Sequence, residues 1–295
     1  MRTQVVILGG GPAGMLLAEI LHQAGVESVV LELRSRDYVS SRIRAGVLEQ
    51  GSVELLRAAG VGDRLDREGI PHDGSAIVWA GKSDFFIDTQ RFANSRLAAY
   101  GQANIQADLY AAADRRNAAF LDEVSDARPQ DLDTGRPFVT FRHNGQEQHI
   151  DCDFVAGCDG FHGVSRSAIP SEILRCYDKQ YPFGWLGIMS QTPPVPHITY
   201  ANHPRGFALA SMRNPMLSRY YVQVPLSDRI EDWPDERFWE ELLARFPAEI
   251  SRSIVTGASI EKSIAPLRSF VAEPMRHGRL FLAGDAAHIV PPTAA

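Results

Sequence analysis

The sequence predicts an α/β fold in which a domain built on a parallel sheet is interrupted by a mostly antiparallel β domain and then resumes. Three observations support this. Apolar runs alternate with helical patterns over residues 1–60, aromatic-rich alternating segments follow Pro170, and a short apolar run returns at residues 279–283. Alternating strands and helices are typical of parallel sheets, because neighbouring parallel strands need a helical crossover.

Local patterns place the elements of the first part of the chain. Met15, Ala18 and Leu21 fall at helical spacing, and residues 47–59 form a second helical pattern that ends at Gly60. A third helix contains Ile105, Leu109 and Ala112. The predicted strands are residues 3–8, 28–33, 138–141 and 149–153, and the last two flank Asn144-Gly145, a pair typical of two-residue hairpin turns.

The second part of the chain reads mainly as strands. These are residues 184–190, 198–202, 206–213 and 219–224. A helix carrying Phe238, Leu242 and Phe246 follows, and residues 279–283 are expected to rejoin the first sheet as a buried strand. The predicted organisation is therefore a nucleotide-binding domain at 1–175 that resumes at 268–295, with a substrate-binding β domain at 176–267.

Composition excludes several classes of protein. The 295 residues are 44% hydrophobic and 22% charged, as in ordinary globular proteins, and the net charge of -6 offers no field that attracts nucleic acid. The sequence contains no run of 18 consecutive apolar residues, so we expect no membrane-spanning helix. The three cysteines, Cys152, Cys158 and Cys176, form no zinc pair and no even disulfide set, so we expect no metal site, reduced thiols and a cytoplasmic location.

A glycine fingerprint lies between the first predicted strand and helix. Gly9, Gly11 and Gly14, with Pro12 and Ala13 between them, have the G-x-G-x-x-G spacing. This spacing allows a tight turn, a close approach to a pyrophosphate and close packing of the helix on the strand. A glycine-rich turn without a ligand is the alternative, but Glu32 ends the second strand, where a carboxylate can accept the ribose hydroxyls. The glycine fingerprint and Glu32 together predict dinucleotide binding.

Two further strand ends identify the dinucleotide. Residues 155–160 end in Asp159-Gly160, and residues 282–288 contain Gly284-Asp285. Together with the fingerprint, in this order, they resemble the class A flavoprotein aromatic hydroxylases. The resemblance implies a Rossmann-like FAD-binding domain of the glutathione-reductase type, with Asp159 near the cofactor and Asp285 near its ribityl chain.

Four longer segments narrow the resemblance. Residues 42–50, 181–187, 200–209 and 263–270 are similar to the 4-hydroxybenzoate 3-monooxygenase family. This implies that Arg44 and Gln102 contact FAD, and that Arg42, His162 and Arg166 serve NADPH. The last three read from the sequence alone as solvated surface charge. Residues 33–38 leave the choice between NADPH and NADH open, because Arg34 and Arg36 suit a 2′-phosphate and Leu33 does not.

Ser211 and Arg213 are candidates to bind an anionic substrate. They lie two apart on a predicted strand and so face the same side, and Tyr221 lies on the next strand. A guanidinium bonds both oxygens of a carboxylate, although an ordinary exposed strand face is the alternative. The resemblance implies that these three side chains bind the substrate carboxylate.

The resemblance also assigns the remaining site residues. Tyr200 matches a tyrosine that hydrogen-bonds the substrate phenol, and Pro292 and Thr293 match a loop that borders the phenol and the flavin. Arg219 matches a residue that supports the flavin, and His72 matches the outer end of a proton path.

The implied activity is hydroxylation of 4-hydroxybenzoate to 3,4-dihydroxybenzoate with FAD, NADPH and O₂, in a homo-oligomer, most simply a dimer. Family members continue past the position of Ala295 with a helical region. The expected consequences are weaker FAD binding, poorly coupled hydroxylation and association through an exposed sheet. The alternative is a non-catalytic protein that binds FAD or an aromatic acid.

Overall fold

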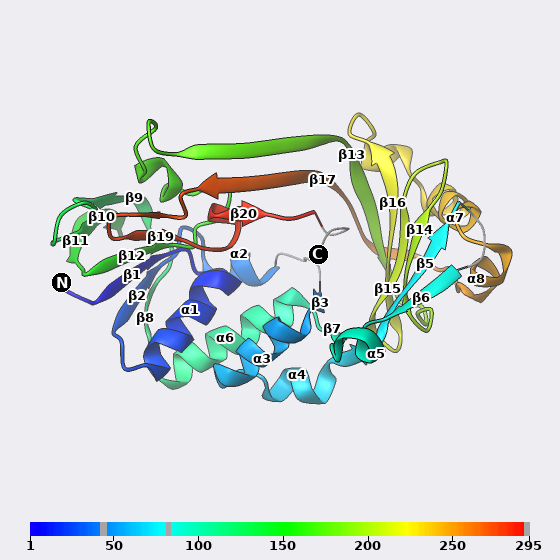
Figure 1. Ribbon diagram of the computed structural model, residues 1–295, viewed down its shortest axis with the longest axis horizontal. Helices are drawn as coiled ribbons and strands as arrows, with labels where there is room; N and C mark the ends of the chain where they lie inside the picture. The colour runs from blue at the N-terminus through cyan, green and yellow to red at the C-terminus, as the bar shows by residue number, and fades with distance from the viewer. Residues whose placement is uncertain (42–45, 81–83, 292–295) are drawn as a thin grey trace.

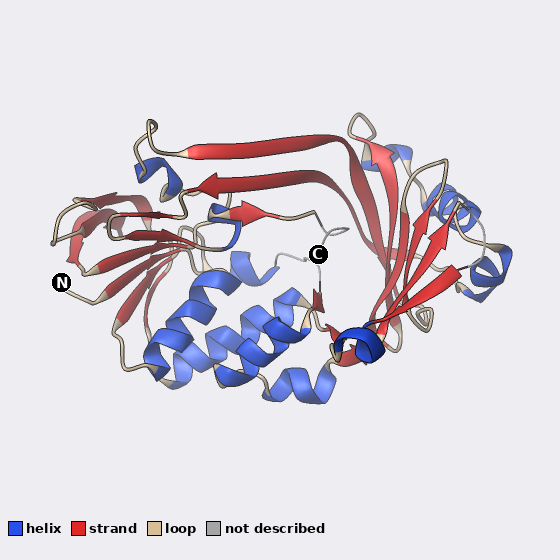
Figure 2. Cartoon of the chain, in the orientation of Figure 1, coloured by secondary structure: helices blue, strands red, loops and turns tan. Residues whose placement is uncertain are grey.

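The computed structural model describes residues 1–41, 46–80 and 84–291 and contains two large sheets with helices packed against them (Figures 1 and 2). The predicted α/β fold is confirmed. Within the described residues, no helix is long and apolar enough to cross a membrane.

The first large sheet has six strands in the order β18-β19-β12-β1-β2-β8. All neighbours are parallel except β18, which pairs antiparallel with β19. The strands are β1 (Val5–Leu8), β2 (Ser28–Leu31), β8 (Ala119–Leu121), β12 (Phe154–Gly157), β18 (Arg276–His277) and β19 (Leu280–Leu282). Because β19 pairs with β12, the late part of the chain does rejoin the first sheet, as predicted.

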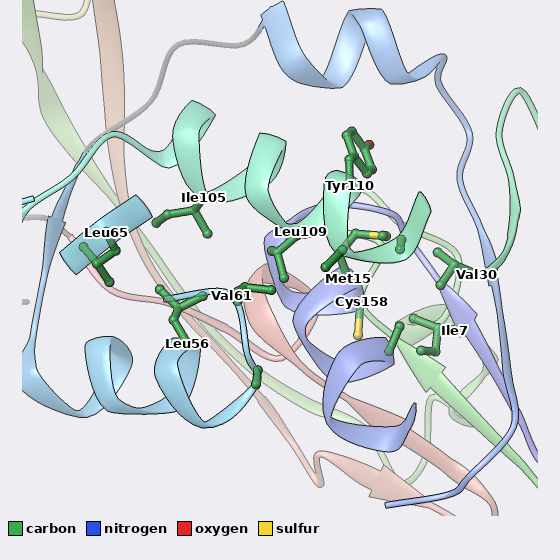
Figure 3. Close-up of a cluster of buried hydrophobic side chains, with 14 of the residues drawn as sticks. Ile7, Met15, Val30, Leu56, Val61, Leu65, Ile105, Leu109, Tyr110 and Cys158 are labelled. Carbon is green, nitrogen blue, oxygen red and sulfur yellow. The ribbon is translucent and has the colours of Figure 1, made fainter. Parts of the chain in front are cut away.

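Successive residues of β1 serve two different cores. Ile7 faces a cluster made with the helices α1 (Pro12–Gln23), α3 (Gln50–Ala58), α4 (Asp63–Glu68) and α6 (Gln102–Arg115), shown in Figure 3. Val6 faces the opposite side, where it packs with Val139 and Phe141 of a three-stranded sheet. That sheet consists of β9 (Ser125–Gln130), β10 (Phe138–His143) and β11 (Gln146–Asp151). The parallel sheet is therefore covered on both faces, as parallel sheets are.

The hairpin predicted at Asn144-Gly145 is confirmed between β10 and β11, and both residues have positive φ, at 52° and 75°. These values match the two-residue turns that suit the twist of a hairpin.

The single helix predicted over residues 47–59 is wrong at its start. Val47 and Leu48 form the short strand β3 (Val47–Leu48), which pairs with β7 (Leu97–Ala99), and only then does α3 begin. β7 also pairs with β4 (Ile70–His72). A backbone partner distant in sequence has outweighed the helical pattern, which local spacing does not reveal.

The second large sheet has eight strands in the order β20-β17-β13-β16-β15-β14-β5-β6. They are β5 (Gly74–Trp79), β6 (Asp84–Asp88), β13 (Arg175–Ser190), β14 (Ile198–Asn202), β15 (Ala208–Asn214), β16 (Leu217–Pro225), β17 (Ser259–Glu273) and β20 (His288–Ile289). One face packs on α7 (Asp235–Ala244) and its neighbours through a core that includes Leu186, Tyr220 and Phe238. Shorter helices are α2 (Arg36–Ser41), α5 (Thr89–Ala93), α8 (Ala248–Ser253), η1 (Arg166–Ala168), η2 (Ile230–Asp232) and η3 (Gly284–Ala286).

The long strands β13 and β17 pair antiparallel from Arg175 opposite Glu273 to Ser190 opposite Ser259, and they run from one large sheet to the other (Figure 1). β5 and β6 also join the second sheet, through parallel pairing of β5 with β14. The strands β5 and β6, which the sequence prediction assigned to the first domain, thus lie in the second sheet. The domain limits at 175 and 267 remain a prediction.

Leu186 tests the core behind the second sheet. It is fully buried on β13, so the Leu186→Ala variant should lower the free energy of unfolding by about 2–5 kcal/mol. Leu226→Ala, at an exposed position just after β16, should change it by less than about 0.5 kcal/mol. Urea unfolding of both variants measures the difference, and equal effects would contradict this placement of the core.

Candidate active site

The glycine fingerprint forms the turn between β1 and α1. Gly9 has a φ of +103°, and a Cβ there would lie 2.3 Å from the carbonyl oxygen of Cys158. A Cβ on Gly14 would lie 1.9 Å from the carbonyl oxygen of Gly9, so the helix packs on the turn at a distance that only glycine permits. Nothing lies within 4 Å of a Cβ built on Gly11, which leaves its backbone open to a ligand. The turn therefore has the geometry of a pyrophosphate site.

Glu32 closes this turn from the end of β2. Its side chain is buried, and its two carboxylate oxygens accept the backbone amides of Gly10 at 2.6 Å and Arg34 at 2.8 Å. Each oxygen has a second lone pair, so the fixed carboxylate retains acceptors for ribose hydroxyls.

A cavity of about 700 Å³ opens beside the turn. This volume is typical of a small-molecule site. Its wall contains nine of the cofactor residues predicted from the sequence: Gly9, Gly11, Pro12, Ala13, Glu32, Gln102, Asp159, His162 and Asp285. Backbone amides at a helix start, a fixed carboxylate and small residues suit the phosphates and ribose of FAD. Arg42 and Arg44 lie outside the described residues.

Two of the predicted cofactor residues stabilise a loop beside the cavity. The Asp159 carboxylate accepts the backbone amide of Ser165 at 2.8 Å and also its hydroxyl. Arg166 donates to the carbonyls of Phe161 at 2.6 Å and Ala286 at 3.1 Å. The Arg166 guanidinium is thus held by protein groups, whereas His162 is exposed at the cavity wall. Sequence reading missed the contribution of Ser165, because a serine in a loop carries no distinctive signal.

The predicted carboxylate-binding residues meet on one face of the second sheet. Ser211, Arg213 and Tyr221 come from β15 and β16, and Arg219, which the resemblance assigned to the flavin, lies beside them; these four residues are here called the Arg213 cluster. The Ser211 hydroxyl donates to the carbonyl of Arg219 at 3.0 Å, and the Arg219 guanidinium lies 5.0 Å from the centre of the Tyr221 ring. Burial lowers the pKa of Arg213, although the nearby Tyr221 opposes this shift.

Aromatic side chains lie beside this cluster; Trp185, Phe207 and Tyr200 are here called the aromatic wall. Trp185 stacks on Phe207 with ring centres 4.5 Å apart and an interplanar angle of 6°, and it lies 5.3 Å from Tyr221. Tyr200 lies 6.0 Å from Phe207, and burial raises the pKa of its phenol. Trp185 and Phe207 fall within segments that carried the family resemblance, but their pairing was not predicted, because it depends on β13 and β15 flanking the same strand.

Of the other predicted residues, Pro292 and Thr293 lie outside the described residues, directly after Pro291. His72 lies on β4 and is buried, and its Nε2 atom has no hydrogen-bond partner among the residues that the structure describes. Burial lowers its pKa, and the nearby His197 lowers it further. The resemblance assigns His72 to the outer end of a proton path, and this role stays a prediction.

Comparisons with known proteins agree with this geometry. The model of the FAD binding domain family matches residues 2–295. The chain is 51% identical to p-hydroxybenzoate hydroxylase of Acinetobacter baylyi over 297 aligned positions, which cover all of this chain and 73% of that protein. It is 27% identical to 3-(3-hydroxy-phenyl)propionate/3-hydroxycinnamic acid hydroxylase of Comamonas testosteroni, over 97% of this chain and 48% of that protein.

Solved structures share the fold at low identity. The p-nitrophenol 4-monooxygenase of Pseudomonas putida has a TM-score of 0.83 and 19% identity, over 99% of this chain and 75% of its own. The family match and this relative support FAD as the cofactor. The chain belongs to the FAD-binding-domain family of flavin-dependent aromatic hydroxylases, together with p-hydroxybenzoate hydroxylase.

Proposed function

We propose that this protein hydroxylates 4-hydroxybenzoate to 3,4-dihydroxybenzoate, using FAD, NADPH and O₂. The observation that carries the proposal is the Arg213 cluster. Within the described residues Arg213 forms no ion pair; its Nη1 donates to the carbonyl of Met212 at 3.3 Å, and its guanidinium also interacts with the Tyr221 side chain. A half-buried guanidinium without a carboxylate favours an anionic ligand, and Arg binds carboxylates through two parallel bonds.

The aromatic wall supplies the rest of the proposed recognition. Arg213, Ser211 and Tyr221 bind the carboxylate at one end of the substrate, and Tyr200 binds the phenol at the other. Trp185 and Phe207 pack near the substrate ring and exclude water. FAD, when bound, supplies the redox chemistry that uses NADPH and O₂. The protein contributes binding, orientation and a dry environment.

The remaining assignments are proposals on the same basis. The residues that serve FAD are Gly9, Gly11, Gly14, Glu32, Gln102, Asp159, Asp285, Arg219 and, outside the described residues, Arg44. Arg42 and His162 receive NADPH, with Arg166 holding the loop beside them. Pro292 and Thr293 border the phenol, and His72 takes part in proton exchange from a buried position. We further propose a cytoplasmic homodimer.

Gly14 tests the cofactor site. A Gly14→Ala variant should raise the dissociation constant for FAD at least tenfold, about 1.4 kcal/mol, because its Cβ would collide with the Gly9 carbonyl. Gly51→Ala is the matched control, since a Cβ there meets nothing within 4 Å on helix α3. Titration of apoprotein with FAD gives both constants, and unchanged FAD affinity in Gly14→Ala would contradict the role of this turn.

Arg213 tests the substrate site. Arg213→Gln should weaken 4-hydroxybenzoate binding by about 2 kcal/mol or more, roughly thirtyfold, because the ligand carboxylate would lose its cation. Binding of 4-hydroxybenzamide, which has no charge, should change little. Calorimetry on the FAD-loaded protein measures both, with Arg252→Gln on α8 as control. Equal losses for acid and amide would argue against a carboxylate site.

His72 links its burial to acid stability. Burial lowers the pKa of His72 below 6.5 in the folded protein. Below pH 6.5 the imidazole therefore binds a proton in the unfolded chain more readily than in the folded protein. The contribution of neutral His72 to the free energy of unfolding is therefore fully present above pH 6.5, and it is lost as the pH falls towards the lowered pKa of His72. His72→Gln should lose less stability than wild type between pH 7.5 and 5.5, whereas exposed His22→Gln should match wild type in urea unfolding. The same pH dependence in His72→Gln and wild type would contradict this.

A further inference from the structure

The Arg213 cluster contains two guanidiniums, which come from the neighbouring strands β15 and β16. Arg219 extends from β16 across β13, where its Nη1 donates to Glu261 of β17 at 2.7 Å and its Nη2 lies 3.4 Å from the Ser263 hydroxyl. β15, which carries Arg213, lies on the other side of β16. The ion pair with Glu261 thus holds Arg219 away from the strand of Arg213.

Gly187 of β13 makes this crossing possible. It pairs with Tyr221 on one side and Ser263 on the other. A Cβ at Gly187 would lie 2.6 Å from the Tyr221 ring and 3.0 Å from Nη2 of Arg219. The missing side chain is therefore the space that the Arg219 guanidinium and the Tyr221 ring occupy.

The two arginines consequently differ in how their charges are compensated. Burial lowers the pKa of Arg219, but Tyr221 and Glu261 outweigh it and the net pKa is raised. Burial lowers the pKa of Arg213, and the net pKa stays lowered. Arg219 is only 7% exposed and Glu261 21%, so their charges are poorly screened by water. One carboxylate opposes two guanidiniums, and it contacts Arg219.

We propose that Glu261 is a positioning and specificity-determining residue. By pairing with Arg219 it compensates one of the two positive charges, so that only the charge of Arg213 is left for a single ligand carboxylate. The inference rests on the proposed function, because it assumes that the ligand is an aromatic acid. It adds a residue of β17 to a site otherwise formed by β13 to β16. Without the Glu261 charge, both guanidiniums would attract the ligand carboxylate.

The test compares 4-hydroxybenzoate with uncharged 4-hydroxybenzamide on FAD-loaded protein by calorimetry. Glu261→Gln should raise the ratio of acid affinity to amide affinity about tenfold, because a negative charge is removed from a poorly hydrated site. Asp235→Asn is the matched control. Asp235 pairs at 2.7 Å with Lys262, the next residue of β17, which lies opposite Ile188 of the core behind the sheet. It should leave the ratio unchanged.

The possible results separate the role of Glu261 from the proposed function. An unchanged ratio in Glu261→Gln, or an equal rise in Asp235→Asn, overturns the role of Glu261 and leaves the proposed function intact. Wild-type protein that binds acid and amide equally overturns the proposed function itself. If Glu261→Gln does not fold, Glu261→Asp decides, because the shorter side chain withdraws from Arg219: the ratio should rise by roughly twofold to threefold, and a wild-type ratio overturns the inference.

Discussion

The pairing of β13 with β17 is the constraint on which the rest of the structure depends. At one end, Phe270 and Ala272 of β17 enter the core beneath the parallel sheet, together with Val6 and Leu8 of β1. At the other end, Leu186 and Ile188 of β13 enter the core beside α7. One strand pair, with an irregularity between Gln180 and Gly184, therefore belongs to both cores. It fixes the cofactor cavity and the Arg213 cluster relative to each other more firmly than a flexible linker would.

Charge placement explains how this frame becomes a binding site. Buried guanidiniums are costly unless they are paired. Arg166 is paired with carbonyls, and Arg245 with Glu241 at 2.8 Å, and both serve structure. Arg213 has no such ion pair within the described chain. Its uncompensated charge stands at the end of an aromatic wall, and a planar aromatic acid suits this combination.

The features that the sequence predicted are those that depend on a few neighbouring residues. The fingerprint glycines, Glu32 and the Asn144-Gly145 turn depend on a few neighbouring backbone torsions, and each is readable in a short window. The strand face of Ser211 and Arg213 followed from alternation alone. Pairings distant in sequence were not readable: β3 with β7, β5 with β14, and Trp185 with Phe207. The hydrogen bonds of Arg166 to two backbone carbonyls and the burial of His72 depend on such packing, so neither was readable from the sequence. The family resemblance, and not the composition, supplied the substrate.

The most direct test of the account is NADPH consumption by purified, FAD-supplemented protein, with and without 4-hydroxybenzoate, with product and hydrogen peroxide quantified together. We predict that 4-hydroxybenzoate stimulates consumption and that 3,4-dihydroxybenzoate accumulates, whereas 4-hydroxybenzamide stimulates it much less. Consumption that ignores 4-hydroxybenzoate, or that yields only peroxide, would contradict the proposed hydroxylase. It would favour a protein that binds FAD and an aromatic acid without converting the acid.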